Sequence, residues 1–289
     1  MKISIVIASR NEGDELAATC ANLADGAPGA EIIVVDDASD KPERGYTIRN
    51  ERRLGVAKSR AIGFARSSGD VCGFVDAHMH FKRGAIESVA EAALDAGGFA
   101  YAGCNGHAAA TLRRTADGLF ACHWTAAPKV VSQTTGMMGA CYFAPRDVLL
   151  RMGGWIQLPG HYGMDEEAMS ILAARCGVPI VNVPQVDNWH LFRGQRGSAS
   201  APVPYTLTPD MVAVNVAATH RFLFGDDVWP ALRAGLLNMT ALHGQPMQCP
   251  ERVIRMVETP AFDAYRAALQ SRMTVSGTDF IRQIEGAAR

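Results

Sequence analysis

The sequence lacks the features that mark several large classes of protein. Its 289 residues contain no apolar run of 18, so we expect no transmembrane helix. The apolar part of the N-terminal segment is too short for a signal peptide and is better interpreted as a first strand. A net charge of −1 gives no general attraction to nucleic acid or to a membrane surface. With 48% apolar and 20% charged residues, the composition is typical of an ordinary soluble globular protein.

The cysteines lack a pattern. There are seven, an odd number, and none forms a Cys-x-x-Cys pair. Disulfide frameworks and zinc ribbons both need regular cysteine spacing. We therefore expect reduced, buried thiols in a cytoplasmic protein.

The first hundred residues alternate between strand-like and helix-like segments. The strand-like segments are continuously apolar, and the helix-like segments carry apolar residues at helical spacing. Strands without polar alternation, separated by helices, predict a parallel sheet with both faces covered. The strands are predicted at 3–9, 30–39 and 71–78, and the helices at 13–25, 55–69 and 84–97.

The later part of the chain is less regular. A short strand in "ACYFA" is followed by a helix that ends at Gly153-Gly154, and another helix, 165–177, begins with acids where the helix dipole favours them. The Gly, Ser and Pro content after it indicates a mobile segment. The remaining predictions are a strand at 178–184, a mobile loop at 188–204 and mainly helical structure at 205–289.

Polar side chains follow each of the first three predicted strands. Parallel sheets bind ligands at the carboxyl ends of their strands, so these side chains are candidates for a binding site. Two adjacent acids repel each other unless a cation or a hydrogen-bond donor faces them, although such a pair can also start a turn or cap a helix. The segments are Ser9-Arg10-Asn11-Glu12, Asp36-Asp37 and Asp76-Ala77-His78.

Five motifs occur in an order that resembles a known family. They are "SIVIASRNEGDEL", "IIVVDDASD", "RLGVAKSRAIGFARSSGDVCGFVDAHMHF", "GMDEEAMSILAARCG" and "NWHLFR". Together they resemble GT-A fold glycosyltransferases, especially family 2 and the polypeptide N-acetylgalactosaminyltransferases, whose third strand ends in a DxD or DxH metal motif. The resemblance implies an α/β, Rossmann-like fold with a mixed, mostly parallel sheet flanked by helices. To this fold the sequence adds a helical C-terminal extension.

The resemblance also implies a division of the chain. Residues 1–195 would form the GT-A domain, with a nucleotide-binding half at 1–100 and an acceptor and catalytic half at 101–195. Residues 196–289 have no counterpart, and a lid, an acceptor platform or a contact in a homo-oligomer are all open. The implied activity is metal-dependent transfer of a hexosyl or N-acetylhexosaminyl group from a nucleotide sugar, most simply a UDP-sugar, to a hydroxyl. The acceptor can be a glycan, lipid, protein or nucleotide, and either stereochemical outcome is open.

The stretch at 76–80 supplies candidate metal ligands. Asp76 and His78 are alternate residues of an extended segment, so both point to one side and can bind one cation. A mixed oxygen and nitrogen set suits Mn²⁺ and, less well, Mg²⁺. In the DxH relatives a distant histidine completes the site, and that position matches His190 in the loop. His80 has no counterpart in the motif and would lie behind the ligands or face the acceptor.

The resemblance assigns further residues to the base and ribose. Ala8, Arg10 and Glu12 would border them. Asp36 or Asp37 would accept a hydrogen bond from the uracil N3–H or from a ribose hydroxyl.

Two arginines are assigned to the phosphates. Arg60 matches an arginine that lies near the base and phosphates in the family, although the asparagine that often follows it is Ala61 here. Arg193 would close on the diphosphate. A solvated loop is the alternative for Arg193 and Arg196.

The acids at 165–167 are the candidate catalytic groups. In inverting relatives the second acid of the pair deprotonates the acceptor, which implies Glu166 as the base and Asp165 as a ligand of acceptor or donor sugar. In retaining relatives the corresponding acid contacts the donor sugar. Stabilisation of a helix N-terminus is the alternative. Trp155 would pack near the acceptor opening or in the core.

Two other functions compete with this interpretation. The H-x-H of "HMH" also ends the first barrel strand of zinc-dependent amidohydrolases, but three strands precede or include it here and "VVDDAS" has no role in that fold. The other is a GT-A protein that binds a nucleotide sugar without catalysis. The presence of Asp76, His78, Asp165 and Glu166 argues against it.

Overall fold

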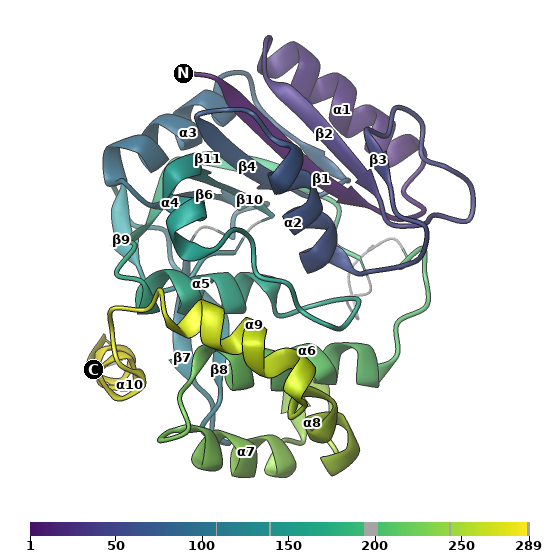
Figure 1. Ribbon diagram of the computed structural model, residues 1–289. Coiled ribbons are helices and arrows are strands. Elements are labelled where there is room, and N and C mark those ends of the chain that lie inside the picture. The colour runs from purple at the N-terminus through teal and green to yellow at the C-terminus, as the bar shows by residue number, and fades with distance from the viewer. Residues whose placement is uncertain (108, 139, 194–201, 243, 288–289) are drawn as a thin grey trace.

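The computed structural model describes residues 1–107, 109–138, 140–193, 202–242 and 244–287 (Figure 1). Its centre, within these residues, is a nine-stranded mixed sheet in the order β3-β2-β1-β4-β10-β6-β11-β5, with β9 paired to β11. The strands are β1 (Ile3–Ser9), β2 (Glu31–Asp36), β3 (Ile48–Arg49), β4 (Val71–Val75), β5 (Met79–His80), β6 (Phe99–Cys104), β9 (Ser132–Thr134), β10 (Cys141–Pro145) and β11 (Ile180–His190).

Most strands of the sheet share one direction. β10 runs against its neighbours β4 and β6, and β5 and β9 run against β11. The remaining pairs are parallel, so the carboxyl ends of β1, β2 and β4 lie at one edge of the sheet. The predicted fold, a mixed and mostly parallel sheet flanked by helices, is confirmed.

Helices cover both faces of the sheet because its strands are apolar on both sides. In β1, Ile5 and Ile7 face one core while Val6, between them, faces the other. The first face is covered by α1 (Asp14–Gly26) and α3 (Ala85–Ala96), and the second by α2 (Val56–Arg66), α4 (Arg146–Met152) and α5 (Asp165–Arg175).

A glycine sets how closely α2 approaches the sheet. A Cβ atom added at Gly63 would lie 2.3 Å from Cγ1 of Val6, so a larger residue would push the helix away from β1. The close packing places Arg60, one turn earlier in α2, at the carboxyl edge of the strands. The same glycine-dependent contact therefore positions a candidate site residue.

The helices that follow β11, together with the β7–β8 hairpin, form a layer beneath α5 (Figure 1). One hydrophobic core runs from β4, β6 and β10 through α5 into the C-terminal helices. The elements of this lower layer are β7 (Ala109–Arg114), β8 (Phe120–Thr125), α6 (Pro209–Leu223), α7 (Trp229–Asn238), β12 (Ala241–Leu242), β13 (Gln245–Pro246), α8 (Glu251–Val257), α9 (Pro260–Gln270) and α10 (Gly277–Ala287).

A buried histidine joins β8 to α6. The backbone N–H of Phe120 donates to Nε2 of His220 at 3.0 Å, and Nδ1 of His220 donates to the carbonyl of Val216 at 2.8 Å. Burial lowers the pKa of His220 to about 4, so the ring is neutral at physiological pH. A neutral ring can accept one bond and donate the other, which fixes the β7–β8 hairpin on α6.

The structure corrects two local predictions. The strand predicted at 178–184 extends to His190, so Asn188 and His190 belong to β11 rather than to a mobile loop. Pairing with β6 and β5 stabilises this polar stretch, which has no apolar run of its own. Of the predicted loop, residues 194–201, Arg196 included, lie outside the described part of the chain.

Two further features concern the described helices and the cysteines. Among the described helices, none combines the length and the apolar character needed to cross a bilayer. All seven cysteines lie in the described residues, are free of disulfides, and are buried or half-buried as expected.

Candidate functional site

A large cavity lies at the carboxyl edge of the sheet. It has a volume of about 1010 Å³, and the loops after β1, β2 and β4 form one of its walls. The predicted site residues that line it are Ala8, Arg10, Glu12, Asp37, Arg60, Asp76, His78, Asp165, Glu166, His190 and Arg193.

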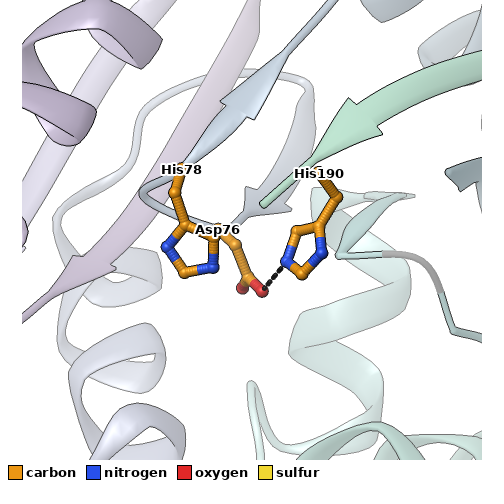
Figure 2. A group of neighbouring side chains, drawn as sticks. All are labelled: Asp76, His78 and His190. Atoms are coloured by element: carbon orange, nitrogen blue, oxygen red, sulfur yellow. Dashed lines mark hydrogen bonds and ion pairs between the residues drawn. The ribbon is translucent and has the colours of Figure 1, made fainter. Parts of the chain in front are cut away.

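Three of these side chains converge on one point (Figure 2). Asp76, His78 and His190 each offer a ligand atom, and these atoms lie within 4.8 Å of one another. Nε2 of His190 is 3.3 Å from Oδ2 of Asp76. The convergence follows from strand pairing, because β5 pairs with β11 and sets His190 opposite Met79, the neighbour of His78.

The backbone between Asp76 and His78 forms a turn, whereas the sequence predicted an extended strand. Thr19 of α1 holds this turn: its Oγ1 donates to the carbonyl of Ala77 at 3.0 Å and accepts from the N–H of Met79 at 3.0 Å. The two side chains still meet on one side of the chain, but through a turn and not through strand alternation.

A buried arginine links the cluster to the catalytic acids. Arg60 is 3% exposed; its Nη2 lies 2.6 Å from Oδ1 of Asp76, and its Nη1 pairs with Oδ2 of Asp165. The guanidinium stacks over Tyr142 and Trp155. Burial alone would raise the pKa of Asp76, but the hydrogen bond from His190 and the charge of Arg60 hold it well below its usual range. Asp76 is therefore a carboxylate at any physiological pH.

Trp155 belongs to the core. It is 1% exposed and packs on Phe74 and Tyr142, with ring centroids 4.1 and 5.6 Å away. Of the two roles left open for it, packing in the core is the one observed. Its ring packs against the guanidinium of Arg60, and it does not line the cavity.

The loop after β1 presents Glu12 beside the cluster. Nη2 of Arg193 lies 2.5 Å from Oε2 of Glu12, and Nδ1 of His78 is 3.2 Å from the same oxygen, without hydrogen-bond geometry. Glu43 fixes the loop, because its carboxylate accepts from the N–H groups of Glu12 and Gly13 and from Oγ of Ser9. In this state Arg193 faces a carboxylate.

The adjacent acids after β2 have different surroundings. Asp37 lines the cavity and accepts from the N–H groups of Leu54 and Gly55. Asp36 does not reach the cavity: it is fully buried and pairs with Arg49. Successive side chains of an extended chain point to opposite sides. Asp36 therefore pairs with Arg49 in the interior, whereas Asp37 faces the cavity.

The acids at the start of α5 also differ. Asp165 is 7% exposed and held by Arg60, while Glu166 is half-buried and lines the cavity. Burial raises the pKa of Glu166 well above its usual value, and the charges of Asp165 and Glu167 raise it further. A carboxyl group of this kind can take up a proton nearer neutral pH than an ordinary glutamate.

His80 lies apart from the metal-ligand cluster. It is exposed, pairs in the strand ladder with Trp189, and lines a separate surface hollow of about 420 Å³. The H-x-H alternative therefore fails on two counts: His78 is joined by His190 instead of His80, and the described strands form an open sheet where an amidohydrolase needs a closed barrel.

Part of the cavity wall was not predicted. Strand β8, the hairpin β12–β13 and α6 contribute side chains from regions where the sequence has no recognised motif. Short strands that pair with distant or equally short partners leave no periodic signal strong enough to find. The wall residues missed include Trp124, Met138, Tyr162, Tyr205, Val212, Leu242 and Met247.

Comparison with known proteins agrees with this geometry. Residues 4–115 match the model of glycosyl transferase family 2. The structure is similar to that of GalNAc-T7 with UDP, GalNAc and Mn²⁺, at 17% identity and a TM-score of 0.59, covering 91% of this chain and 57% of that one. This chain thus spans little more than half the length of GalNAc-T7.

Two further structures are similar over nearly the whole chain. They are the mannosyltransferase PcManGT from Pyrobaculum calidifontis with GDP-Man and Mn²⁺ (15% identity, TM-score 0.51, 94% of this chain and 84% of that one) and S. aureus TarS 1–349 with UDP-GlcNAc (13%, 0.54, 94% and 91%). At such identities the likeness concerns the fold. Residues 4–115 are thus similar to glycosyl transferase family 2, and the chain as a whole has the GT-A fold of these structures.

Proposed function

We propose that this protein is a glycosyltransferase that moves a hexosyl or N-acetylhexosaminyl group from a nucleotide sugar, most simply a UDP-sugar, to an acceptor hydroxyl with the help of a divalent cation. The observation that carries the proposal is the meeting of Asp76, His78 and His190 in one cavity with Glu166. The ligands of the similar structures support it, since GalNAc-T7 and TarS hold UDP or UDP-GlcNAc and two of the three hold Mn²⁺.

The three side chains fit a divalent cation. One carboxylate and two imidazoles form a mixed oxygen and nitrogen donor set, which suits Mn²⁺. Nδ1 of His190 is buried and has no hydrogen-bond partner among the described residues, so the ring is not committed to a second protein group. When bound, the cation would neutralise the negative charge that develops on the diphosphate leaving group.

Arg60 orients the two acids on either side of it. Its fork holds one oxygen of Asp76 and one of Asp165, which leaves Oδ2 of Asp76 turned toward His190. Both terminal nitrogens of the guanidinium already pair with carboxylates, so its role toward the phosphates would be indirect. It keeps the metal ligand ionised and in place.

Glu166 would act on the acceptor. In a single displacement the acceptor oxygen forms a bond to the anomeric carbon, the bond from that carbon to the diphosphate breaks, and Glu166 takes the hydroxyl proton. Its raised pKa suits this task, because a general base works best when its pKa lies near the working pH. Arg193 would exchange Glu12 for the diphosphate as the donor enters.

Thermal unfolding with UDP tests the proposal. UDP at about 100 times its Kd should stabilise the wild type by about 2.7 kcal/mol in the presence of MnCl₂ and not in the presence of EDTA. Asp76→Ala should lose this stabilisation and any hydrolysis of UDP-sugars, while His80→Ala, on β5 and outside the cluster, should keep both. Metal-dependent stabilisation of Asp76→Ala equal to that of the wild type would remove the metal assignment.

A second measurement, the release of UDP from UDP-sugars, distinguishes the transferase from a protein that binds nucleotide sugars without catalysis. The latter would show the UDP-dependent stabilisation but no release of UDP from any UDP-sugar over hours. Release that depends on Glu166 supports the transferase.

A further inference from the structure

The far wall of the cavity differs in chemistry from the edge of the sheet. Beyond the acids of α5, the wall is formed by β8, α6, the β12–β13 hairpin and the segments beside them. Its large side chains are apolar, and three of them are methionines. They are Trp124, Met138, Met164, Val212, Leu242 and Met247.

These side chains stand on the main hydrophobic core. Met164 and Leu242 are 4% and 7% exposed, and Met138, Val212 and Met247 are half-buried against the same core. Such side chains have a firm support on one side and the cavity on the other. The wall is therefore formed before any ligand arrives.

Hydrogen bonds fix the backbone of this wall. The β12–β13 hairpin is closed by pairing of Leu242 with Gln245 and by the N–H of Met247, which donates to the carbonyl of Thr240 at 2.9 Å. On the other side, His220 holds the start of β8 on α6. The apolar side chains of this wall therefore stand on backbone segments that hydrogen bonds hold in place.

A row of rings connects the metal-ligand cluster to this wall. The ring of His190 meets Phe192 edge to face at 4.6 Å, Phe192 meets His107 at 5.7 Å, and His107 meets Trp124 at 5.2 Å. Phe192 and Trp124 both line the cavity. A molecule that extends from the cluster to the far wall would contact ring faces and edges along its path.

Polar side chains also line the cavity near this surface: Thr115, His123, Tyr162, Glu167 and Gln245. None of them interrupts the patch formed by Met138, Met164, Leu242 and Met247, all of which pack against the main core. A sugar ring buried here would need a partner for most of its hydroxyl groups, because an unpaired buried polar group is unfavourable. An apolar group would instead gain from leaving water, and flexible methionines adapt to more than one shape.

We propose that the acceptor carries an apolar group, alkyl or aryl, next to its reacting hydroxyl or sugar, and that this group occupies the wall of Met138, Met164, Leu242 and Met247. The inference rests on the proposed function and names the acceptor class that the same site takes. The reacting hydroxyl would lie at Glu166, and the apolar group would extend away from the donor.

Matched glycosides test the proposal. Methyl, n-octyl and phenyl β-glucosides share one sugar and differ in the group attached to it. Their dissociation constants are measured by calorimetry with the wild type loaded with UDP and MnCl₂. We expect the octyl or the phenyl glycoside to bind at least about tenfold more tightly than the methyl glycoside, since burial of a few CH₂ groups suffices for that ratio. A preference for octyl indicates an alkyl group and a preference for phenyl an aryl group.

Two variants locate the effect. Met247→Gln and Met138→Gln should each reduce the ratio by about fivefold or more, because the amide is unfavourable beside an apolar ligand. Met256→Gln, at a 54% exposed position on α8 outside the cavity, should leave it unchanged. The melting temperature of each variant shows that it is folded.

The outcomes separate this inference from the proposed function. Equal affinity for all three glycosides in a protein that binds UDP with Mn²⁺ and hydrolyses a UDP-sugar overturns the apolar acceptor and leaves the transferase standing. A ratio that persists in both cavity variants also overturns it. A wild type that neither binds UDP nor hydrolyses any UDP-sugar overturns the function, and the acceptor inference with it.

Discussion

The cavity joins two regions that are built in different ways. At the edge of the sheet, short loops directly after strands carry charged groups, and two of the carboxylates face arginines: Asp76 faces Arg60, and Glu12 faces Arg193. At the far wall, apolar side chains stand on a core assembled from segments far apart in sequence. The first region suits a diphosphate with its cation, and the second an uncharged acceptor.

The acid that we propose as the base lies where the two regions meet. Glu166 lies at the start of α5, which contributes to both regions. Asp165, beside it, is neutralised by Arg60, while Glu166 has no partner of opposite charge as close as that among the described residues. Its proton affinity is raised where the acceptor hydroxyl would meet the donor.

Removing the acid at this junction should have the largest effect. Glu166→Gln keeps the shape of the side chain but cannot take a proton, so turnover should fall by about 100-fold or more. Affinity for UDP with Mn²⁺ should stay within about twofold, because the nucleotide region is untouched. Initial rates and calorimetry measure the two quantities. Turnover close to that of the wild type would assign the base to another residue.

Breaking the charged region from within should cost stability. Arg60→Gln leaves Asp76 and Asp165 without their common cation, and removal of one partner of a buried ion pair destabilises by roughly 3 kcal/mol. The matched control is Arg151→Gln, whose bond to Asp147 is exposed and should contribute less than about 1 kcal/mol. Urea denaturation compares the two. Equal losses in both variants would mean that Arg60 does not organise the site.

The proposed movement of the Arg193 side chain from Glu12 to the diphosphate can be tested by kinetics. If its guanidinium leaves Glu12 for the diphosphate, Arg193→Ala should raise the KM for a UDP-sugar by about tenfold, which corresponds to about 1.4 kcal/mol. Turnover at saturation should change less. Steady-state kinetics with a fixed acceptor measures both, and an unchanged KM would show that the arginine stays on Glu12.

The raised pKa of Glu166 predicts a smaller effect on stability. A carboxyl group whose pKa is higher in the folded than in the unfolded protein favours folding at low pH, and this contribution is lost as the pH rises through the folded value. At neutral pH, Glu166→Gln should therefore melt a few degrees above the wild type, and below the ordinary pKa of glutamate the two should coincide. Calorimetry at several pH values measures the difference in melting temperature between the variant and the wild type. A difference that does not change with pH, or one of the opposite sign, would contradict the prediction.

The same pKa shapes the pH dependence of the reaction. Activity requires the ionised base, so kcat/KM should fall as the pH drops through the raised value, well before an ordinary glutamate would be protonated. A pH–rate profile of the wild type measures the position of this limb. An acid limb at the usual value for glutamate would contradict the assignment.

The charged region could be predicted from the sequence because its residues are local. Asp76 and His78 follow directly after an apolar strand, and the strand end determines where they lie. Sequence alone could not decide between Asp36 and Asp37, since only the structure shows that Asp37 lines the cavity while Asp36 pairs with Arg49.

The rest depends on contacts between distant segments. His190 was expected in a loop because its own stretch is polar, and pairing with β5, about a hundred residues earlier in the chain, is what makes it a strand end. The wall around Trp124 and Leu242 comes from short hairpins that no local periodicity reveals. Sequence patterns therefore predicted the charged region of the cavity and did not predict its apolar wall.

Calorimetric titration of UDP, with and without MnCl₂, into the wild type and His190→Ala tests the central claim most directly. UDP should bind the wild type at least about tenfold more tightly with Mn²⁺ than with EDTA, and His190→Ala should lose this gain while His80→Ala keeps it. Equal UDP affinity with and without the metal in the wild type, or a full gain in His190→Ala, would contradict it.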